Sequence, residues 1–250
     1  MLEERIEDKS FLKLIRKWLK AGILEEDGKI ILPVTGTPQG GSISAVLANI
    51  YLHFALDLWF EKKVKPYCRG KVTIIRFADD FICCFQYADD ANRCLKSLKT
   101  RLQKFNLELS ETKTRLIRFT RFITCNSNSF VFLGFEFRWK IARSGKPVVR
   151  LKTAKKKYKL AVQSIKNWIK SSRSTRIREL MKTYKSKLQG HWNYYGVCGN
   201  FDMLQQFFWN ANRIVFKWLN RRSQRKSFNW NGFSSILVFY KIPRPKIVAR

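Results

Sequence analysis

The sequence is short of acidic residues and of long apolar runs. Eighteen Asp and Glu stand against 50 Lys and Arg among 250 residues, which gives a formal net charge of +32. No apolar run reaches the roughly 18 residues that a membrane-spanning helix needs, and residues 1–8 are too acidic for a signal peptide. We therefore expect no membrane partner. A charge this positive predicts a polyanionic partner, with nucleic acid as the first candidate.

Cysteine is also scarce. Six cysteines in a chain of this length are too few for a disulfide scaffold, and none has the spacing of a zinc site. This pattern favours a reducing, cytoplasmic location. Cys83 and Cys84 lie within an apolar run, where we expect one thiol on each side of a buried strand and a packing role rather than redox chemistry.

The positive charge is unevenly distributed. Residues 151–250 contain 23 basic and two acidic residues with five of the eight tryptophans, whereas residues 1–150 contain 27 basic and 16 acidic residues. A single basic helix face is as often simply solvated, but a hundred residues with two acids favour nucleic-acid contact. The turn signal at residues 144–147 marks a boundary. It predicts domains at 1–145 and 146–250.

The apolar pattern predicts an α+β fold. The first part mixes helices and strands, and the second part has helical periods with lysines on the opposite face. Expected helices span residues 9–21, 43–58, 91–106, 158–169, 177–188 and 203–219. Expected strands span residues 29–34, 72–77, 81–85, 107–109 and 115–119, with a hairpin between 130–137 and 148–151.

Two adjacent carboxylates, Asp79 and Asp80, interrupt an apolar β run and predict a hairpin turn. Their mutual repulsion would be offset by a divalent cation, and phosphoryl-transfer enzymes use carboxylate-bound Mg²⁺ to hold the attacking and leaving oxygens. On spacing alone, a turn that simply faces water explains the pair equally well. The second pair, Asp89 and Asp90, precedes a helical pattern and is expected to cap it.

Three motifs occur in order: residues 37–41 (Thr-Pro-Gln-Gly-Gly), 77–80 (Phe-Ala-Asp-Asp) and 132–135 (Phe-Leu-Gly-Phe). Together with residues 40–52 and 109–114, they resemble the palm of a group II intron reverse transcriptase. Residues 188–196 resemble the maturase-specific domain of that family, which also forms the polymerase thumb. The resemblance implies a partial palm, an antiparallel sheet with helices on one face, followed by a basic helical thumb and maturase domain.

The resemblance also implies roles for individual residues. Asp79 and Asp80 would be the catalytic carboxylates that bind Mg²⁺, two ions in the complete enzyme, and Lys113 would lie near the triphosphate as a proton donor, unless it is a solvated turn lysine. Phe77 stands where the family usually has Tyr. The residues implied for nucleotide binding are Pro38, Gln39, Gly40 and Phe77, and those implied for the primer grip are Phe132, Leu133, Gly134 and Phe135.

Contacts to RNA phosphates are expected from basic residues that have no core role. For Trp192, Tyr194 and Tyr195, packing between helices is favoured over stacking on bases. The expected phosphate contacts are Lys155, Lys156, Lys157, Arg221, Arg222, Arg225 and Lys226.

The implied activity is that of an RNA-directed DNA polymerase, a nucleotidyltransferase in which a primer 3′-hydroxyl attacks the α-phosphate of a dNTP. The implied maturase role is intron RNA binding that assists RNA splicing, in a mobile element protein of prokaryotic type. The family carries a further metal-binding Asp on a strand before the Pro-Gln-Gly segment, and we expect this chain to be truncated after it. Three alternatives stay open: a polymerase completed by a separate N-terminal fragment, a catalytically silent RNA-binding remnant, or a product that does not fold stably.

Overall fold

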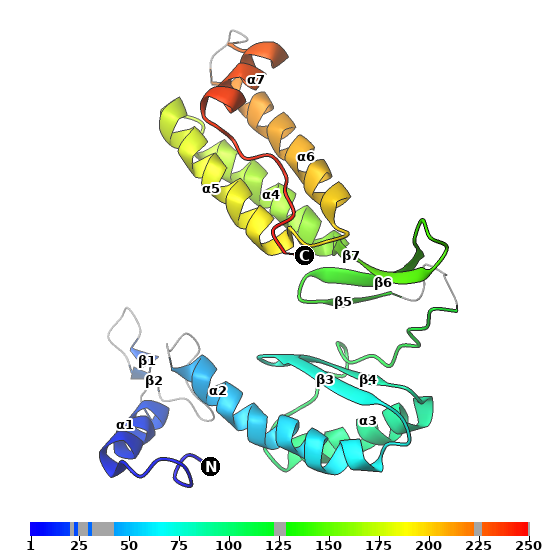
Figure 1. Ribbon diagram of the computed structural model, residues 1–250. Helices are drawn as coiled ribbons and strands as arrows, with labels where there is room; N and C mark the ends of the chain where they lie inside the picture. The colour runs from blue at the N-terminus through cyan, green and yellow to red at the C-terminus, as the bar shows by residue number, and fades with distance from the viewer. Residues whose placement is uncertain (21–22, 25–29, 32–42, 123–128, 223–226, 250) are drawn as a thin grey trace. The chain divides into compact units, whose positions relative to one another are not determined.

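The computed structural model describes residues 1–20, 23–24, 30–31, 43–122, 129–222 and 227–249. The chain divides into two compact units, Met1–Leu116 and Ile117–Arg250, which are described separately below (Figure 1). None of the described helices combines the length and apolar character that crossing a membrane requires. The sequence-based limit at residue 145 falls within a hairpin of the second unit, and it stays a prediction.

The first unit begins with a surface helix, as its spacing predicts. Asp8 caps this helix, because its Oδ1 accepts from the backbone N–H groups of Ser10 and Phe11 at 2.8 and 3.0 Å. The elements of the unit are α1 (Lys9–Lys20), β1 (Ile23–Leu24), β2 (Ile30–Ile31), α2 (Ser44–Leu52), η1 (His53–Asp57), η2 (Phe60–Val64), η3 (Lys65–Tyr67), β3 (Val72–Phe77), β4 (Asp80–Phe85) and α3 (Ala88–Gln103).

The helix that follows residue 43 differs from its prediction. It runs from α2 through the π-helical segments η1 and η2 to the 3₁₀ turn η3. The apolar stripe predicted through Val46 and Phe54 is not buried, and the buried positions are Ala55, Leu56, Phe60 and Val64. Helix α2 contains no buried residue although it is regular α-helix, so the first part of the predicted stripe stays unburied. Beyond it, the π turns hold more residues than α turns and displace the buried positions from the 3.6-residue period.

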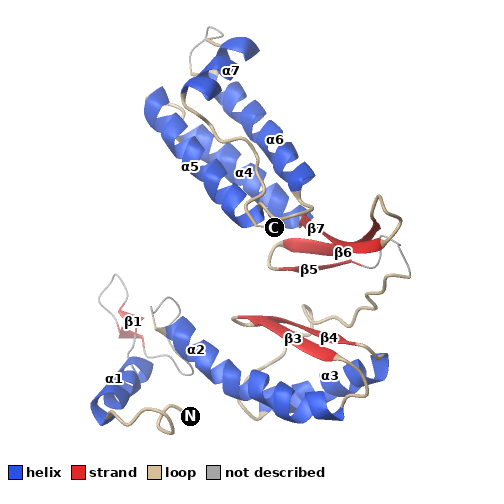
Figure 2. Cartoon of the chain, in the orientation of Figure 1, coloured by secondary structure: helices blue, strands red, loops and turns tan. Residues whose placement is uncertain are grey.

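Strands β3 and β4 form the predicted antiparallel hairpin and pack against α3 and the π-helical segments. Figure 2 shows this hairpin in red beside the blue helices. Cys83 contacts the core formed by Phe60, Val64 and Cys94, while Cys84 is exposed, as expected. Burial raises the pKa of the Cys83 thiol to about 12, which keeps it protonated and unreactive at neutral pH.

Two predicted strands are wrong, because residues 107–109 and 115–119 form no strand. Helix α3 begins at Ala88, and Asp89 and Asp90 lie within its first turn, where acids complement the helix dipole as expected, but neither side chain caps the helix by a hydrogen bond. Asp90 is instead buried, where it accepts from the backbone N–H of Arg69 at 3.0 Å and pairs with Arg93. Its role is to hold the segment that precedes β3.

The described residues of the second unit form a three-stranded antiparallel sheet and four helices. The sheet has the order β5 (Ser129–Phe132), β6 (Phe135–Ile141), β7 (Pro147–Thr153). The segment predicted as one strand, residues 130–137, is therefore two strands joined by a turn. The helices are α4 (Lys155–Ser171), α5 (Ile177–Tyr195), α6 (Phe201–Leu219) and α7 (Trp230–Phe239).

The core of this unit is the interior of the helical bundle (Figure 1), where Trp192, Tyr184 and Phe233 are fully buried. The Tyr184 hydroxyl donates to Asn212 Oδ1 at 2.7 Å, so these two buried side chains satisfy each other. Asn200 joins the sheet to the bundle: its Oδ1 accepts from the Thr153 N–H, and its Nδ2 donates to the Tyr195 carbonyl, both at 2.8 Å.

Candidate active site and nucleic-acid interface

The acidic turn lies at the tip of the β3–β4 hairpin. Its two connecting residues are Ala78 and Asp79, and Asp80 is already the first residue of β4, paired with Phe77. The sequence-based turn at residues 79–80 is thus displaced by one position. Ala78 adopts a positive φ of 53°, the conformation that tight hairpin turns require. Asp79, Asp80 and Phe77 are all exposed, with the Phe77 ring 65% accessible.

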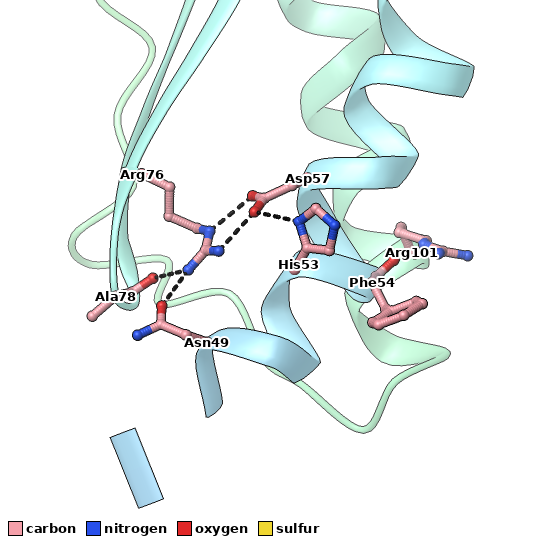
Figure 3. A network of polar contacts seen from close by, with 7 residues as sticks. All are labelled: Asn49, His53, Phe54, Asp57, Arg76, Ala78 and Arg101. Atoms are coloured by element: carbon pink, nitrogen blue, oxygen red, sulfur yellow. Dashed lines mark hydrogen bonds and ion pairs between the residues drawn. The ribbon is translucent and has the colours of Figure 1, made fainter. Parts of the chain in front are cut away.

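Arg76 fixes this turn from the protein side (Figure 3). Its Nη1 donates to the Ala78 carbonyl at 2.9 Å and to Asn49 Oδ1 at 2.7 Å. Its Nε and Nη2 form a bidentate pair with the Asp57 carboxylate at 2.8 and 2.7 Å. The guanidinium thus ties the turn to the helix formed by α2 and η1, in the fork geometry that Arg, and not Lys, provides.

Electrostatics support the pair formed by Arg76 and Asp57. Partial burial alone would raise the pKa of Asp57, but hydrogen bonds from Arg76 and His53 outweigh it and hold the pKa below its usual value. His53 Nδ1 lies 3.3 Å from Asp57 Oδ2. Further along the helix, Arg101 of α3 donates to the carbonyls of Phe54 and Ala55 at 3.1 and 3.0 Å. The π-helical segment η1 is therefore held by Arg76 through Asp57 and by Arg101 through two carbonyl groups.

Sequence reasoning missed this network. It assigned no role to His53 or to Arg76. The available signal was a charged residue inside an otherwise apolar β run, because such a residue requires a partner when its strand packs on a core. The partners Asp57 and Asn49 come from a helix whose π turns no periodicity predicts.

The donor chemistry of the turn fits Mg²⁺. This ion is commonly bound by one or two carboxylates together with water and substrate phosphates, and Asp79 and Asp80 present carboxylates at an exposed tip. Within the described part of the chain, no group of three or more His, Cys, Asp or Glu is arranged to hold a metal. Asp8, Glu3, Asp89 and Asp90 already have partners in the fold. The two turn carboxylates would therefore act with ligands supplied by substrate or by other protein segments.

Lys113 is exposed on a turn that follows α3 rather than between two strands. Its N–H donates to the Ser110 carbonyl at 3.2 Å, and the neighbouring Glu111 pairs with Lys99 of α3 at 2.7 Å. The remaining nucleotide-site residues of the prediction, Pro38, Gln39 and Gly40, lie outside the described residues. Their roles and that of Lys113 stay predictions.

The four residues implied for the primer grip belong to the second unit and form the turn between β5 and β6. Phe132 and Phe135 pair across the ends of β5 and β6, and the connecting Leu133 and Gly134 have φ of 47° and 79°. Positive φ at both central positions defines a type I′ turn. Leucine is rare in that conformation, which is why the sequence pattern read as a continuous strand.

This turn is attached to the bundle. The Tyr194 hydroxyl donates to the Leu133 carbonyl at 3.0 Å, and the Phe135 ring stacks on Tyr194 with centroids 6.0 Å apart. A Cβ on Gly134 would lie 3.1 Å from the Tyr195 hydroxyl, so the close approach requires glycine. Trp192 is buried, and its Nε1 donates to the Pro243 carbonyl at 3.2 Å. The expected packing role of these aromatic residues is confirmed for Trp192.

The candidate phosphate contacts have different surroundings. Lys155, Lys156 and Lys157 occupy the exposed first turn of α4, which contains no acid. Cations at a helix N-terminus oppose the helix dipole, so this placement favours an anionic partner over a purely structural role. Lys157 also lies beside the primer-grip turn, because its Cγ is 3.7 Å from the Cβ position of Gly134.

The second basic group is partly engaged in the fold. Arg222 donates to the carbonyls of Arg173 and Thr175 in the α4–α5 connection. Arg221 is exposed, with its guanidinium 5.3 Å from the Trp218 ring centroid. Arg225 and Lys226 lie outside the described residues. Arg221 is thus the member of this group with a described, accessible guanidinium.

Two family models match the chain. Residues 2–137 match the reverse transcriptase (RNA-dependent DNA polymerase) model, and residues 158–233 match the group II intron maturase-specific domain. The first match covers more than half of the chain and contains the acidic turn. The second covers most of the helical bundle.

Curated relatives agree with these matches. The group II intron-encoded protein LtrA of Lactococcus lactis subsp. cremoris is 28% identical over 83% of this chain and 47% of its own length. The putative COX1/OXI3 intron 1 protein of Saccharomyces cerevisiae is 41% identical over 28% of the chain and 8% of its own length. An uncharacterised 91 kDa protein in a cob intron of Schizosaccharomyces pombe is 49% identical over 24% of the chain and 7% of its own length.

The chain spans about half the length of the bacterial relative. The order of the two matched models follows the order of the exposed acidic turn and the basic bundle along the chain. On these grounds, the chain belongs to the reverse transcriptase family of group II intron-encoded proteins and includes its maturase-specific domain.

Proposed function

We propose that this protein contributes the acidic hairpin, the primer grip and the maturase surface of a group II intron reverse transcriptase. The observation that carries the proposal is the Arg76 network, which holds the turn bearing Asp79 and Asp80 at an exposed tip. A turn that served only as a solvated connection would need no bidentate ion pair behind it. The substrates would be a template–primer duplex and dNTPs.

The residues of the chain would divide the work of nucleotidyl transfer. Asp79 and Asp80 would hold two Mg²⁺ ions, which when bound neutralise charge on the attacking and leaving oxygens. Arg76 would fix the positions of both carboxylates. The exposed ring of Phe77 would pack against the nucleotide, and Lys113 would donate a proton to the pyrophosphate. The turn at Leu133 and Gly134 would hold the primer strand.

A primer-extension assay tests the polymerase role. The chain is assayed alone and with a separately supplied N-terminal reverse transcriptase fragment, which would bring the further carboxylate. We expect Mg²⁺-dependent extension in the second case, lost in Asp79→Ala and kept in Glu111→Ala, whose carboxylate is also exposed. Absence of extension with folded protein in both cases would contradict a polymerase role and leave the silent RNA-binding alternative.

The maturase role predicts binding of intron RNA by the basic unit. The affinity is expected to fall steeply with salt, because each neutralised phosphate releases counterions. Lys155→Gln combined with Lys156→Gln should weaken binding and reduce the salt slope by about two. Asp79→Ala should leave this binding unchanged. A weak, salt-independent interaction would refute the role.

A cytoplasmic location and an origin in a prokaryotic-type mobile element stay part of this proposal.

A further inference from the structure

Helix α6 has an outer face whose aromatic and basic side chains line an open groove. The groove has a volume of about 790 Å³ and is bordered by α4, α6 and the start of α7. Trp209, Arg213 and Lys217 repeat at four-residue spacing and therefore share one face of α6. The groove is lined by these three residues together with Val162, Phe216 and Trp230.

The two tryptophans of this groove are accessible. Trp209 is 54% and Trp230 is 38% exposed. Trp230 is held edge-on by Phe216, with ring centroids 4.8 Å apart. The Trp209 ring contacts no other aromatic ring and no cation among the described residues. It thus offers a free stacking surface on a rigid helix.

A second groove of about 940 Å³ continues from the first, because Trp209 lines both. It lies between the β6–β7 hairpin and the N-terminal part of α6. Its basic residues are Arg138, Lys140, Arg150 and Lys152, and Asp202 is the single acid among its described lining residues.

Among the described residues, no ion pair joins the basic side chains of this second groove to an acid, although Glu136 lies opposite Lys152 across β6 and β7. Arg138 and Arg150 are directly opposite each other across β6 and β7, an arrangement of like charges that costs stability. The Nε of Arg138 is buried and has no acceptor among the described residues. An anion in the groove would offset the repulsion between the two guanidinium groups. The two grooves together form a track along α6. This track is about 24 Å long from Phe201 to Lys217.

We propose that this track binds a single-stranded RNA segment, with a base stacked on Trp209 and phosphates held by Arg213, Lys217 and the β6–β7 arginines. The proposal rests on the intron RNA binding proposed above and names its site for unpaired nucleotides. Aromatic platforms flanked by cations are the common means of binding single strands without sequence preference. A rigid duplex cannot place a base face on a side chain without unstacking.

The test compares single-stranded and duplex RNA on the full chain. The probes are a labelled uridine oligomer of about ten nucleotides and a blunt-ended RNA duplex of about ten base pairs. Trp209→Ala is expected to weaken binding of the oligomer by about five- to a hundredfold, the range for one stacked base, and to leave duplex binding within about twofold. Trp209→Phe, which keeps an aromatic face, should restore most of the affinity.

Matched controls separate stacking from general effects. Phe239, 77% exposed on α7 and outside both grooves, should tolerate Phe239→Ala without loss. Arg213→Gln should weaken oligomer binding more than Arg178→Gln, which removes the same charge from the exposed surface of α5. Equal loss for both probes in Trp209→Ala, or no loss, would overturn the track. If the unmodified chain binds neither probe, the proposed RNA-binding function fails as well.

Discussion

Arg76 is the residue on which the candidate active site depends most directly. Its side chain is 13% exposed and that of Asp57 is 25% exposed, so removing either charge leaves the other largely enclosed. Asp57→Asn should lower the free energy of unfolding of the first unit by about 1–3 kcal/mol. Hydrogen exchange of the β3 and β4 amides measures this in the unit concerned.

The exposed ion pair between Asp89 and Arg69 provides the control for that prediction. The Asp89 side chain is 76% exposed, and such pairs contribute less than about 1 kcal/mol. Asp89→Asn should therefore change the exchange rates little. If both variants have the same small effect, the network at Arg76 does not hold the hairpin.

His191 makes a second residue-scale prediction, which concerns pH. Burial lowers its pKa to about 4. The imidazole ring stacks on the Phe207 ring with centroids 3.8 Å apart, and its Nε2 has no partner among the described residues. Between pH 6.5 and about 4 the unfolded chain binds a proton that the folded chain does not. Stability should therefore fall as the pH drops through this window, by about 3 kcal/mol from this group.

Urea denaturation at pH 7 and pH 4.5 measures the effect. His191→Phe should reduce the loss between the two pH values, because it removes the group and keeps an apolar ring. An unaltered pH dependence in His191→Phe would show that carboxylates alone cause it.

At the scale of elements, two substitutions in the turn at Leu133 and Gly134 are expected to change the stability of the second unit in opposite directions. Gly134→Ala should destabilise the second unit by about 1–2 kcal/mol, because alanine at positive φ is strained and its Cβ meets Tyr195. Leu133→Asn should stabilise it by up to about 1 kcal/mol, since Asn tolerates this conformation better than Leu. Urea denaturation followed by circular dichroism gives both values. If both substitutions stabilised the unit, or both destabilised it, the type I′ geometry would be contradicted.

The elements also show what the sequence could predict. The β-branched residues of β3 and the apolar periods of α4, α5 and α6 predicted these elements within a few residues at their N-terminal ends. The turn register and the break in residues 130–137 were missed, because Ala78 and Leu133 adopt positive φ that their residue types disfavour. The Arg76 network could not be predicted, since its partners meet through tertiary packing and π turns.

For the whole molecule, the division into units predicts how the chain can be dissected. A fragment of residues 117–250 keeps the sheet together with the bundle, whereas a fragment of residues 146–250 lacks β5 and β6 and the stacking of Phe135 on Tyr194. The longer fragment should unfold cooperatively and be more stable by about 2–3 kcal/mol, the scale of one buried Phe. Equal stabilities would instead favour the limit at residue 145.

The π turns in the helix that follows Ser44 make its length adjustable. Each i→i+5 turn holds about one residue more than an α turn, so deleting one residue from η1 would leave a plain α-helix of nearly the same span. The deletion would carry Asp57 away from Arg76. Relatives with a one-residue deletion at this point should therefore lack an acid at the position of Asp57 or carry it one position away.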